Sequence, residues 1–348
     1  MTDAAPKLLV TGGTGVLGPS LLAALGRSRC LLLRHHAPVA DAAVQTIDGD
    51  LAQPRLGLSA AAYRRLRASI DGIVHAGALT SSLRPAKDVE DVNIGGTRHI
   101  VELAEQAGVP LHHISTFYVR GRDGTHTVPA VDSYQASKRD AERVVEEAAV
   151  PTAIYRLPIL IGDAQTGVIS RFSGQAIYLG AKAIVSGNAH VMPAAAVSYF
   201  DFLPRDYVAQ CLAAAIDGGV RGVLWITAGQ RALPFAEFVD ICVEFAEELG
   251  RPIVRPALVA PDVVDRLVLP AFGDTIPARM RRQLEVANQV MLGMANESHL
   301  PDSREQLPAG VRFPALPDLR ASLSASLRYW AKNTTLPRPI EVPELVQS

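Results

Sequence analysis

The sequence has little of several features that define large classes of protein. Its three cysteines are far apart and form no CxxC pair, so we interpret them as buried small hydrophobes in a reducing compartment. Charges nearly cancel, to a formal net charge of −1, which argues against a nucleic-acid partner. No apolar run reaches the roughly 18 residues of a membrane span, and the first seven residues lack a signal-peptide core. We therefore expect a cytoplasmic protein with no integral membrane segment.

Two common catalytic signatures are also missing. Neither HExxH, which marks zinc hydrolases, nor GxSxG, which marks serine hydrolases, occurs. His112 and His113 are adjacent on an expected strand and point to opposite faces of it, which argues against a shared metal site. We therefore expect no metal.

What is present is an alternation of short apolar stretches with helical patterns. It predicts an α/β Rossmann fold, in which helices cover both faces of a doubly wound parallel sheet. Expected strands are 7–10, 30–33, 72–76, 111–115, 153–157 and 223–226, with a short one before Asp48. The expected domains are a dinucleotide-binding domain (7–160 with about 200–230), a smaller, mostly helical substrate-binding or lid domain (about 161–199 with 231–335), and an extended tail (336–348).

A glycine-rich stretch follows the first expected strand and precedes a helix. It reads Thr11-Gly12-Gly13-Thr14-Gly15-Val16-Leu17-Gly18 and fits both GxxGxxG and GxGxxG. Glycines permit the tight turn and let backbone N–H groups approach a pyrophosphate, and the helix N-terminus supplies partial positive charge. This stretch predicts a dinucleotide site.

The end of the second strand bears on the choice of cofactor. A NAD site usually has Asp or Glu there, to bind the ribose 2′-hydroxyl. This chain has Arg34, followed by His35 and His36. A cation suits a 2′-phosphate and favours NADP, although a solvated Arg34 at a strand end remains the alternative. Asp50 and Leu51, after the next strand, are expected near the adenine.

Small residues end the strand 72–76. In His75-Ala76-Gly77 they let the backbone lie against a cofactor, and we expect His75 itself to be structural rather than catalytic. Asn93 lies in a helical stretch that Gly108 is placed to end. Its side chain is expected to bond a main-chain carbonyl or hold a water.

The predicted chemistry centres on a helix that starts near Ser133. Tyr134 and Lys138 are four residues apart and so stand on one face of it. A phenol beside an ammonium is expected to have a lowered pKa, because the positive charge favours the phenolate. Such a phenol is a usable proton donor and acceptor. The alternative is a surface tyrosine beside a solvated lysine. Thr116, at a strand end, offers a hydroxyl to a substrate oxygen.

Seven motifs stand together in order, and together they resemble the extended short-chain dehydrogenase/reductase family over residues 7 to about 230. They are TGGTGVLG, HAGA, NIGGT, STFYV, YQASK, RLPILIGD and FDFLPRDYVA. Within the family, GDAQTG at 162–167 and YFDFLP at 199–204 are most similar to the thioester-reductase branch. That branch includes fatty acyl-CoA reductases and the terminal reductase domains of carboxylic acid reductases and peptide synthetases.

The resemblance implies a role for each matching residue. Thr116 would hold the substrate carbonyl, and Tyr134 would donate the proton. Lys138 would bind the nicotinamide ribose and lower the pKa of Tyr134, with Asn93 as fourth member in a proton relay. The glycines would bind pyrophosphate and Arg34 the 2′-phosphate. The RLPILIGD motif adds Leu157, Pro158 and Ile159 to the cofactor site.

The implied activity is NADPH-dependent transfer of hydride to an acyl thioester, giving an aldehyde or, after a second hydride, an alcohol. The chain shows no adenylation or carrier domain, so the acyl group would arrive on coenzyme A or on a separate acyl carrier protein. Three alternatives stay open. They are an NADP-dependent ketone, aldehyde or sterol reductase, a nucleotide-sugar epimerase or dehydratase, and a catalytically silent NADP-binding scaffold.

Overall fold

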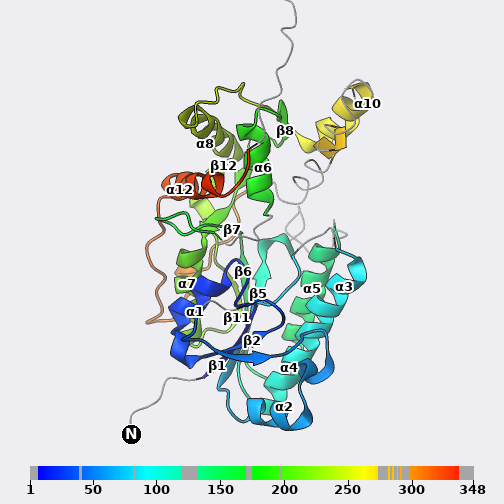
Figure 1. Ribbon diagram of the computed structural model, residues 1–348, viewed down its shortest axis with the longest axis vertical. Coiled ribbons are helices and arrows are strands. Elements are labelled where there is room, and N and C mark those ends of the chain that lie inside the picture. Colours follow the sequence, from blue (N-terminus) through cyan, green and yellow to red (C-terminus); the bar gives the residue numbers. More distant parts are fainter. Residues whose placement is uncertain are drawn as a thin grey trace, which may run out of the picture. The chain divides into compact units, whose positions relative to one another are not determined.

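A computed structural model shows the fold (Figure 1) and describes most of the chain. The described residues are 7–38, 41–80, 84–119, 132–169, 175–195, 197–272, 281–282, 284–285, 288, 291 and 298–336. The predicted tail beyond residue 336 lies outside them. The chain forms two compact units, the first made of Met1–Leu160, Leu203–Ala228 and Pro301–Leu316, the second of Ile161–Phe202, Gly229–Leu300 and Pro317–Ser348.

The first unit is built on a seven-stranded parallel sheet in the order β11-β6-β5-β4-β1-β2-β3. The strands are β1 (Leu8–Thr11), β2 (Cys30–Arg34), β3 (Gln45–Asp48), β4 (Gly72–His75), β5 (Leu111–Thr116), β6 (Thr152–Leu157) and β11 (Gly222–Trp225). This is the doubly wound sheet that the sequence predicts. The apolar stretches of the sequence form strands here. A strand in a sheet covered on both faces is buried on both sides, so a continuous apolar run suits it.

Helices cover both faces of the sheet. Helix α1 (Gly18–Leu25) packs against α7 (Arg205–Asp217) to one side of it, and α4 (Gly96–Ala107) packs against α2 (Ala60–Arg67) and α5 (Ser133–Glu146) on the other (Figure 1). Shorter elements of this unit are α3 (Ala86–Glu90), η1 (Arg27–Arg29), η2 (Pro54–Gly57), η3 (Asp91–Gly95), η4 (Phe117–Val119) and η7 (Arg304–Gln306).

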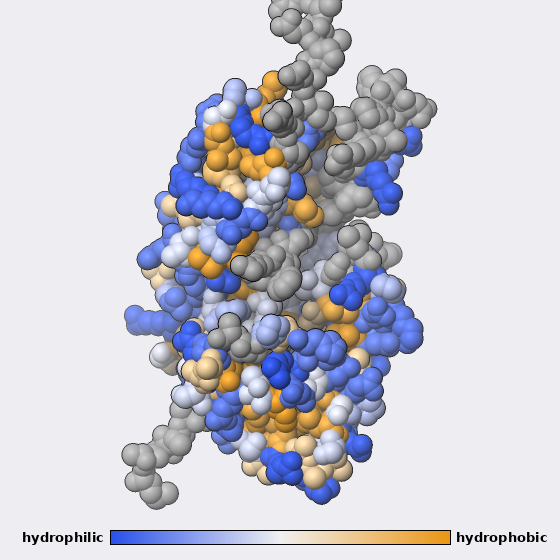
Figure 2. Space-filling model, in the orientation of Figure 1, coloured by the Kyte–Doolittle hydropathy of each residue, from blue (hydrophilic) through white to orange (hydrophobic). Residues whose placement is uncertain are grey.

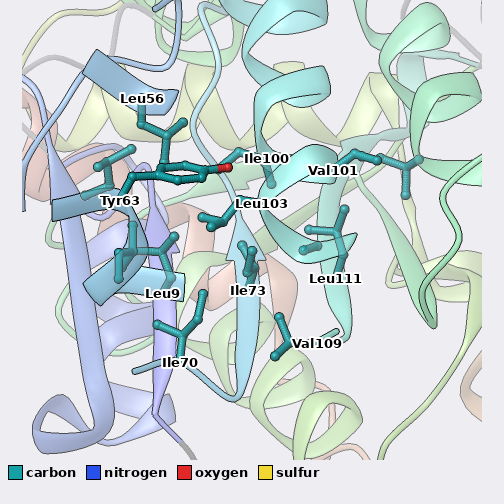
Figure 3. Packing of buried hydrophobic residues seen from close by; sticks show 14 of the residues in the cluster. Leu9, Leu56, Tyr63, Ile70, Ile73, Ile100, Val101, Leu103, Val109 and Leu111 are labelled. Carbon is teal, nitrogen blue, oxygen red and sulfur yellow. The ribbon is translucent and has the colours of Figure 1, made fainter. Parts of the chain in front are cut away.

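A hydrophobic core lies between the sheet and the helices of one face (Figure 3). Strand residues Leu9, Ile73 and Leu111 meet Ile100 and Leu103 of α4, and all five side chains are fully buried. Each such side chain contributes about 1.5–3 kcal/mol relative to exposure. The core therefore fixes α4 and its neighbours relative to the strand ends. Hydrophobic residues also reach the surface in the lower part of the view in Figure 2. A surface pocket is lined by residues of β2, β3 and α2, among them Leu31 and Ile47.

The direction of winding reverses at β1. The chain proceeds outward from β1 to β2 and β3 on one side, then returns to place β4, β5 and β6 on the other. In open α/β sheets, ligands bind outside the carboxyl ends of the strands at such a reversal. The register brings Thr11 beside His75, His75 beside His113, and Thr116 beside Leu157 at those ends.

Within its described residues, the second unit has shorter strands and three longer helices. Its helices α6 (Ala176–Val185), α8 (Phe235–Glu248) and α12 (Leu319–Lys332) pack on one another. Strand β13 (Ala257–Val259) pairs in parallel with β8 (Val191–Pro193), and β12 (Leu233–Pro234) pairs antiparallel with β9 (Tyr199–Phe200). The remaining elements of this unit are η5 (Gly229–Arg231), α9 (Pro261–Val263), η6 (Val264–Val268) and α10 (Leu269–Phe272), while β7 (Ile159–Ile161) and β10 (Phe202–Pro204) lie at the boundaries between the units.

One boundary between the units differs from the expected one. The sequence places residues 301–316 in the substrate-binding part, but in the structure they belong to the first unit. The Thr227 hydroxyl donates to the Pro301 carbonyl at 2.6 Å, and the backbone N–H of Trp225 donates to the Ser303 hydroxyl at 3.0 Å. These bonds hold the segment that begins at Pro301 against the end of β11. No local sequence pattern indicates this contact.

Two further expectations concern cysteines and membranes. Cys30, Cys211 and Cys242 are free and buried, as predicted. Within the described ranges, no helix is long and apolar enough to cross a membrane.

Candidate active site

The glycine loop joins β1 to α1 in a turn that side chains would obstruct. Gly12 has a φ of +72°, in the left-handed region, and a Cβ there would lie 2.4 Å from the Ala76 carbonyl oxygen. A Cβ on Gly18 would lie 2.2 Å from the backbone of Gly13. The loop is therefore folded on itself and against the end of β4, as a close approach of backbone to a pyrophosphate requires.

The helix after this loop starts without a side-chain cap. Leu17 occupies the cap position of α1 and makes no side-chain hydrogen bond to the first turn. Backbone N–H groups there, such as that of Ser20, thus remain available to an anion. The closely packed glycines and the uncapped helix end fit the pyrophosphate of a dinucleotide.

Replacing Gly18 with Ala tests this fit. The new methyl group would collide with the Gly13 backbone, and overpacking of this kind costs about 1–3 kcal/mol. We expect binding of the reduced nicotinamide cofactor, followed by its fluorescence, to weaken about 10- to 100-fold. Gly95→Ala is the matched control, since a Cβ on Gly95 meets nothing within 4 Å. Equal binding by both variants would contradict the assignment of the loop.

His75 connects the loop to the rest of the site by an ordered chain of hydrogen bonds. The Thr97 hydroxyl donates to the Asn93 carbonyl at 2.6 Å, so it accepts from His75 Nε2 at 3.2 Å. His75 Nδ1 then accepts from the Thr11 hydroxyl at 2.8 Å. Burial lowers the pKa of His75 to about 3, with the Lys138 ammonium adding to the effect. His75 is a neutral, fully bonded ring, which agrees with the structural role expected of it.

Asn93 lies in a π-helical turn, η3, between α3 and α4. Its side-chain oxygen accepts from the Leu79 N–H at 2.8 Å, and its amide donates to the Leu79 carbonyl at 3.0 Å and to the Ser137 hydroxyl at 2.9 Å. The predicted bond to a main-chain carbonyl is therefore present. Asn93 ties the segment after β4 to Ser137 of α5, whose hydroxyl donates in turn to the Tyr134 carbonyl at 2.8 Å.

Tyr134 and Thr116 are brought together at the carboxyl end of β5. Asp132 caps α5 by accepting the Gln135 N–H at 2.7 Å, which places Tyr134 in the first turn. The Thr116 hydroxyl accepts the Tyr118 N–H at 3.2 Å and hydrogen-bonds to the Tyr134 phenol. Two hydroxyls thus point to one place, as binding of a carbonyl oxygen requires.

The predicted lowering of the Tyr134 pKa is wrong for this structure. Burial raises the pKa of the phenol to about 12, the Thr116 hydrogen bond opposes the rise, and the Asp132 carboxylate adds to it. Lys138 does not lower it because its ammonium is bound elsewhere. Spacing along a helix places two side chains on one face, but their partners decide where their ends lie.

Lys138 is buried, with 4% of its surface exposed. Its Nζ donates to the Ile114 carbonyl at 2.8 Å and contacts His113 Nε2 at 3.1 Å, both on β5. Burial lowers the pKa of Lys138 to about 8, and the nearby Glu142 carboxylate opposes the fall. The interpretation of Lys138 as a solvated surface lysine is therefore excluded.

Arg34 stands at the end of β2, where the sequence places it, but it has a partner. It pairs with Asp48 of β3 at 2.6 Å, the residue beside it in the sheet register. His35 Nε2 lies 3.7 Å from an oxygen of Asp50, and the His35 and His36 rings are 3.5 Å apart. Arg34 and His35 thus each lie beside a carboxylate, and any 2′-phosphate here competes with Asp48 for Arg34.

The other predicted cofactor residues gather at the same edge of the sheet. Leu51 packs against Gly77, because a Cβ on Gly77 would lie 2.7 Å from the Leu51 side chain. Leu157, the last residue of β6, and Pro158 are buried, and Ile159 is partly buried. Thr14, Gly15 and Val16 form the outer, more exposed part of the glycine loop.

Sequence reasoning missed three polar residues behind Tyr134 and Lys138. Glu142 and Arg156 form a buried ion pair at 2.6 Å, and His113 holds the Lys138 ammonium. The Lys138–Glu142 spacing of four residues was a usable signal. The involvement of Arg156 and His113 depends on which strands lie beside α5. Within the described residues, no cluster of His, Cys, Asp or Glu suits a metal ion.

Solved structures share this fold. The terminal R domain from the myxalamid PKS-NRPS biosynthetic pathway superposes with a TM-score of 0.70 at 21% identity, covering 98% of this chain and 94% of that one. The Bordetella bronchiseptica enzyme WbmG in complex with NAD and UDP gives 0.66 at 19%, covering 98% and 100%. A thiolation-reductase di-domain from an archaeal non-ribosomal peptide synthetase gives 0.67 at 16%, covering 94% and 76%.

The sheet order, the glycine loop and the Tyr134–Lys138 helix define an oxidoreductase of the extended short-chain dehydrogenase/reductase type, with a nicotinamide cofactor. The chain belongs to the family described as Male sterility protein, whose model matches residues 33–212. The predicted resemblance to the thioester-reductase branch is thereby confirmed.

Curated relatives are much longer proteins. A linear gramicidin synthase polypeptide of Brevibacillus parabrevis is 34% identical over 168 residues, which cover 42% of this chain and 3% of the relative. Fusarin C synthetase of Gibberella moniliformis is 29% identical over 235 residues, covering 60% and 6%. The similarity therefore concerns a small part of each synthetase.

Proposed function

We propose that this protein is an NADPH-dependent reductase of acyl thioesters, carried on coenzyme A or on an acyl carrier protein. The observation that carries the proposal is the Thr116–Tyr134 hydroxyl pair at the carboxyl end of β5, with Lys138 one helical turn away. The family and the reductase domains with the same fold support a carbonyl of thioester type. In this proposal the first unit binds the dinucleotide and the second selects the acyl group.

The cofactor, when bound, supplies a hydride to the carbonyl carbon. The chain's own residues act on the oxygen. The Thr116 and Tyr134 hydroxyls bind it as negative charge develops, a small oxyanion hole. Tyr134 then gives its proton to that oxygen. A pKa of about 12 keeps this phenol protonated at neutral pH, which suits a proton donor in the direction of reduction.

Proton transfer leaves a hemithioacetal, which collapses to an aldehyde and a free thiol. The same two hydroxyls can then bind the aldehyde oxygen for a second hydride and proton, giving an alcohol. Asn93 acts on this site through Ser137, whose hydroxyl bonds the Tyr134 carbonyl.

A substrate panel tests the proposal. NADPH consumption is followed with acyl-CoAs, carrier-bound acyl thioesters, aldehydes and ketones, with chromatographic identification of the products. We expect turnover of thioesters with release of free thiol. Turnover of ketones alone, or isomerisation of nucleotide sugars without net oxidation of NADPH, would overturn the proposal.

The preference for NADP is tested at Arg34. Charge-assisted hydrogen bonds of a guanidinium to phosphate contribute about 1.5–3 kcal/mol, so Arg34→Ala is expected to raise the KM for NADPH about 10- to 100-fold and to leave that for NADH unchanged. Asp48→Asn removes the competing carboxylate and is expected to lower the KM for NADPH. Arg27→Ala, which breaks another exposed Arg–Asp pair, is the control. An unchanged NADPH/NADH ratio in Arg34→Ala contradicts the assignment.

A further inference from the structure

The ammonium of Lys138 is held by two consecutive residues of β5. The Ile114 carbonyl accepts one of its hydrogen bonds at 2.8 Å, and His113 Nε2 lies 3.1 Å away. An ammonium has donors only, so His113 Nε2 must be the acceptor and the ring proton must lie on Nδ1. The tautomer of His113 is therefore fixed by its contact with Lys138.

The two imidazoles near Lys138 are both neutral. Burial and the Lys138 ammonium hold the pKa of His113 well below its usual range. The His75 ring of β4 lies 5.3 Å from that of His113, and its pKa is lowered in the same way. Neither ring adds positive charge, and His113 stays an acceptor throughout the neutral range.

A buried carboxylate, that of Glu142, lies behind this contact and pairs with Arg156. Glu142 follows Lys138 by one turn of α5 and opposes the fall of its pKa. Arg156 of β6 donates two hydrogen bonds to the same carboxylate, at 2.6 and 3.1 Å. Its guanidinium lies over the Trp225 ring, 5.0 Å from the ring centre. Ser115 also donates to Glu142. Glu142, Arg156 and His113 are all at least nine-tenths buried.

The charged and titratable groups named around Lys138 come from three neighbouring strands and from α5. His113 comes from β5, His75 from β4, Arg156 from β6, and Glu142 and Tyr134 from α5 itself. Glu142 is the anion that offsets the two buried cations among the described groups, since the other neighbours are neutral near pH 7. Its attraction to Lys138 opposes the effect of burial on the pKa of that ammonium.

We propose that His113 and Glu142 are positioning residues for Lys138, with His113 fixing the place of its ammonium and Glu142 keeping it charged. Their role in catalysis rests on the proposed function. Arg156 limits the effect of Glu142 on the Lys138 ammonium, because its guanidinium pairs with the same carboxylate.

The first test reads Lys138 directly, without substrate. The chain has five lysines, Lys7, Lys87, Lys138, Lys182 and Lys332, so lysine labelled with ¹³C at Cε gives a small set of NMR signals, and Lys138→Met assigns one of them. In the unaltered protein we expect the Lys138 signal to titrate near pH 8. Glu142→Gln is expected to lower the midpoint by about one unit or more, because an opposing charge is lost.

Arg156→Gln is expected to raise the midpoint, since Glu142 then serves Lys138 alone. Opposite shifts in these two variants separate an electrostatic role from simple loosening of the core, which would move both alike. The double variant Glu142→Gln/Arg156→Gln leaves no unpaired buried charge from this pair, and it keeps the test valid if either single variant unfolds. Its midpoint is expected below that of Arg156→Gln.

The second test concerns His113 and has a matched control on the same strand. His113→Phe keeps a planar ring and removes the acceptor, and it is expected to lower the Lys138 midpoint and to reduce kcat/KM about tenfold or more. His113→Asn offers an amide oxygen and is expected to restore part of both. His112 is equally buried but faces away and bonds Tyr155 at 2.9 Å, so His112→Phe should leave the pH profile unchanged.

The outcomes separate this inference from the proposed function. An unshifted Lys138 signal in both His113→Phe and Glu142→Gln would overturn the inference, whatever the enzyme reduces. Shifted signals together with no turnover of any thioester would uphold the contacts and overturn the proposed function instead. Shifted signals with an unaltered pH profile of kcat/KM would show that the contacts do not serve catalysis, which also overturns the inference.

Discussion

Replacing Tyr134 with Phe is expected to lower kcat about 10²- to 10⁴-fold, the usual contribution of a positioned proton donor, while NADPH binding stays nearly unchanged. The phenol is the group that gives its proton to the carbonyl oxygen in the proposed reaction, and Phe fills the same space without it. Thr116 would remain as the lone hydroxyl at this place. Stopped-flow measurement of NADPH oxidation and a separate binding titration distinguish the two effects.

Tyr155→Phe is the control for this variant. Tyr155 is also a buried tyrosine whose pKa is raised, but its hydroxyl bonds His112 on the other side of β5. That variant is expected to lose some stability and to keep its turnover. Undiminished turnover in Tyr134→Phe would show that another group supplies the proton, and the proposed mechanism would be wrong.

Replacing Lys138 with Met is expected to lower kcat/KM at least about 10²-fold and to weaken NADPH binding. In the proposed site, the ammonium both contacts the cofactor's ribose and contributes positive charge beside the reacting centre. Met has a similar length and no charge, so the buried position stays filled. Lys87→Met, at a side chain that is 81% exposed, is the control. Equal activity of the two variants would rule out a role for Lys138.

The same residue gives a pH dependence with a definite sign. The pKa of Lys138 is lowered to about 8 in the folded protein from an ordinary value of 10.5. Between these values the unfolded chain binds the additional proton, so the free energy of unfolding rises with pH across that range. Turnover should fall as the pH rises through about 8, where the folded protein loses the ammonium. Lys138→Met is expected to flatten both profiles, and chemical denaturation at several pH values measures the first.

Much of the fold follows from local pattern. Apolar stretches at regular spacing predicted the strands of the parallel sheet, because strands buried on both faces must be continuously apolar. The glycine loop was predictable because only glycine adopts the backbone of Gly12 and tolerates the contact at Gly18. The one-turn spacing of Tyr134 and Lys138 was readable because helix geometry alone sets it.

The sequence by itself determined which residue types stand at the carboxyl ends of the strands, since the positions of strands along the chain and the period of a helix follow from local preference. Only the tertiary structure decided their charges and partners. Burial, which depends on every neighbouring element, raised the pKa of Tyr134 where the sequence predicted a fall. Folding brought together residues far apart in sequence, so that Lys138 contacts His113 and Ile114. In the same way Arg34 pairs with Asp48. Electrostatic interactions depend on the distances between groups, and those distances are set only once the chain has folded.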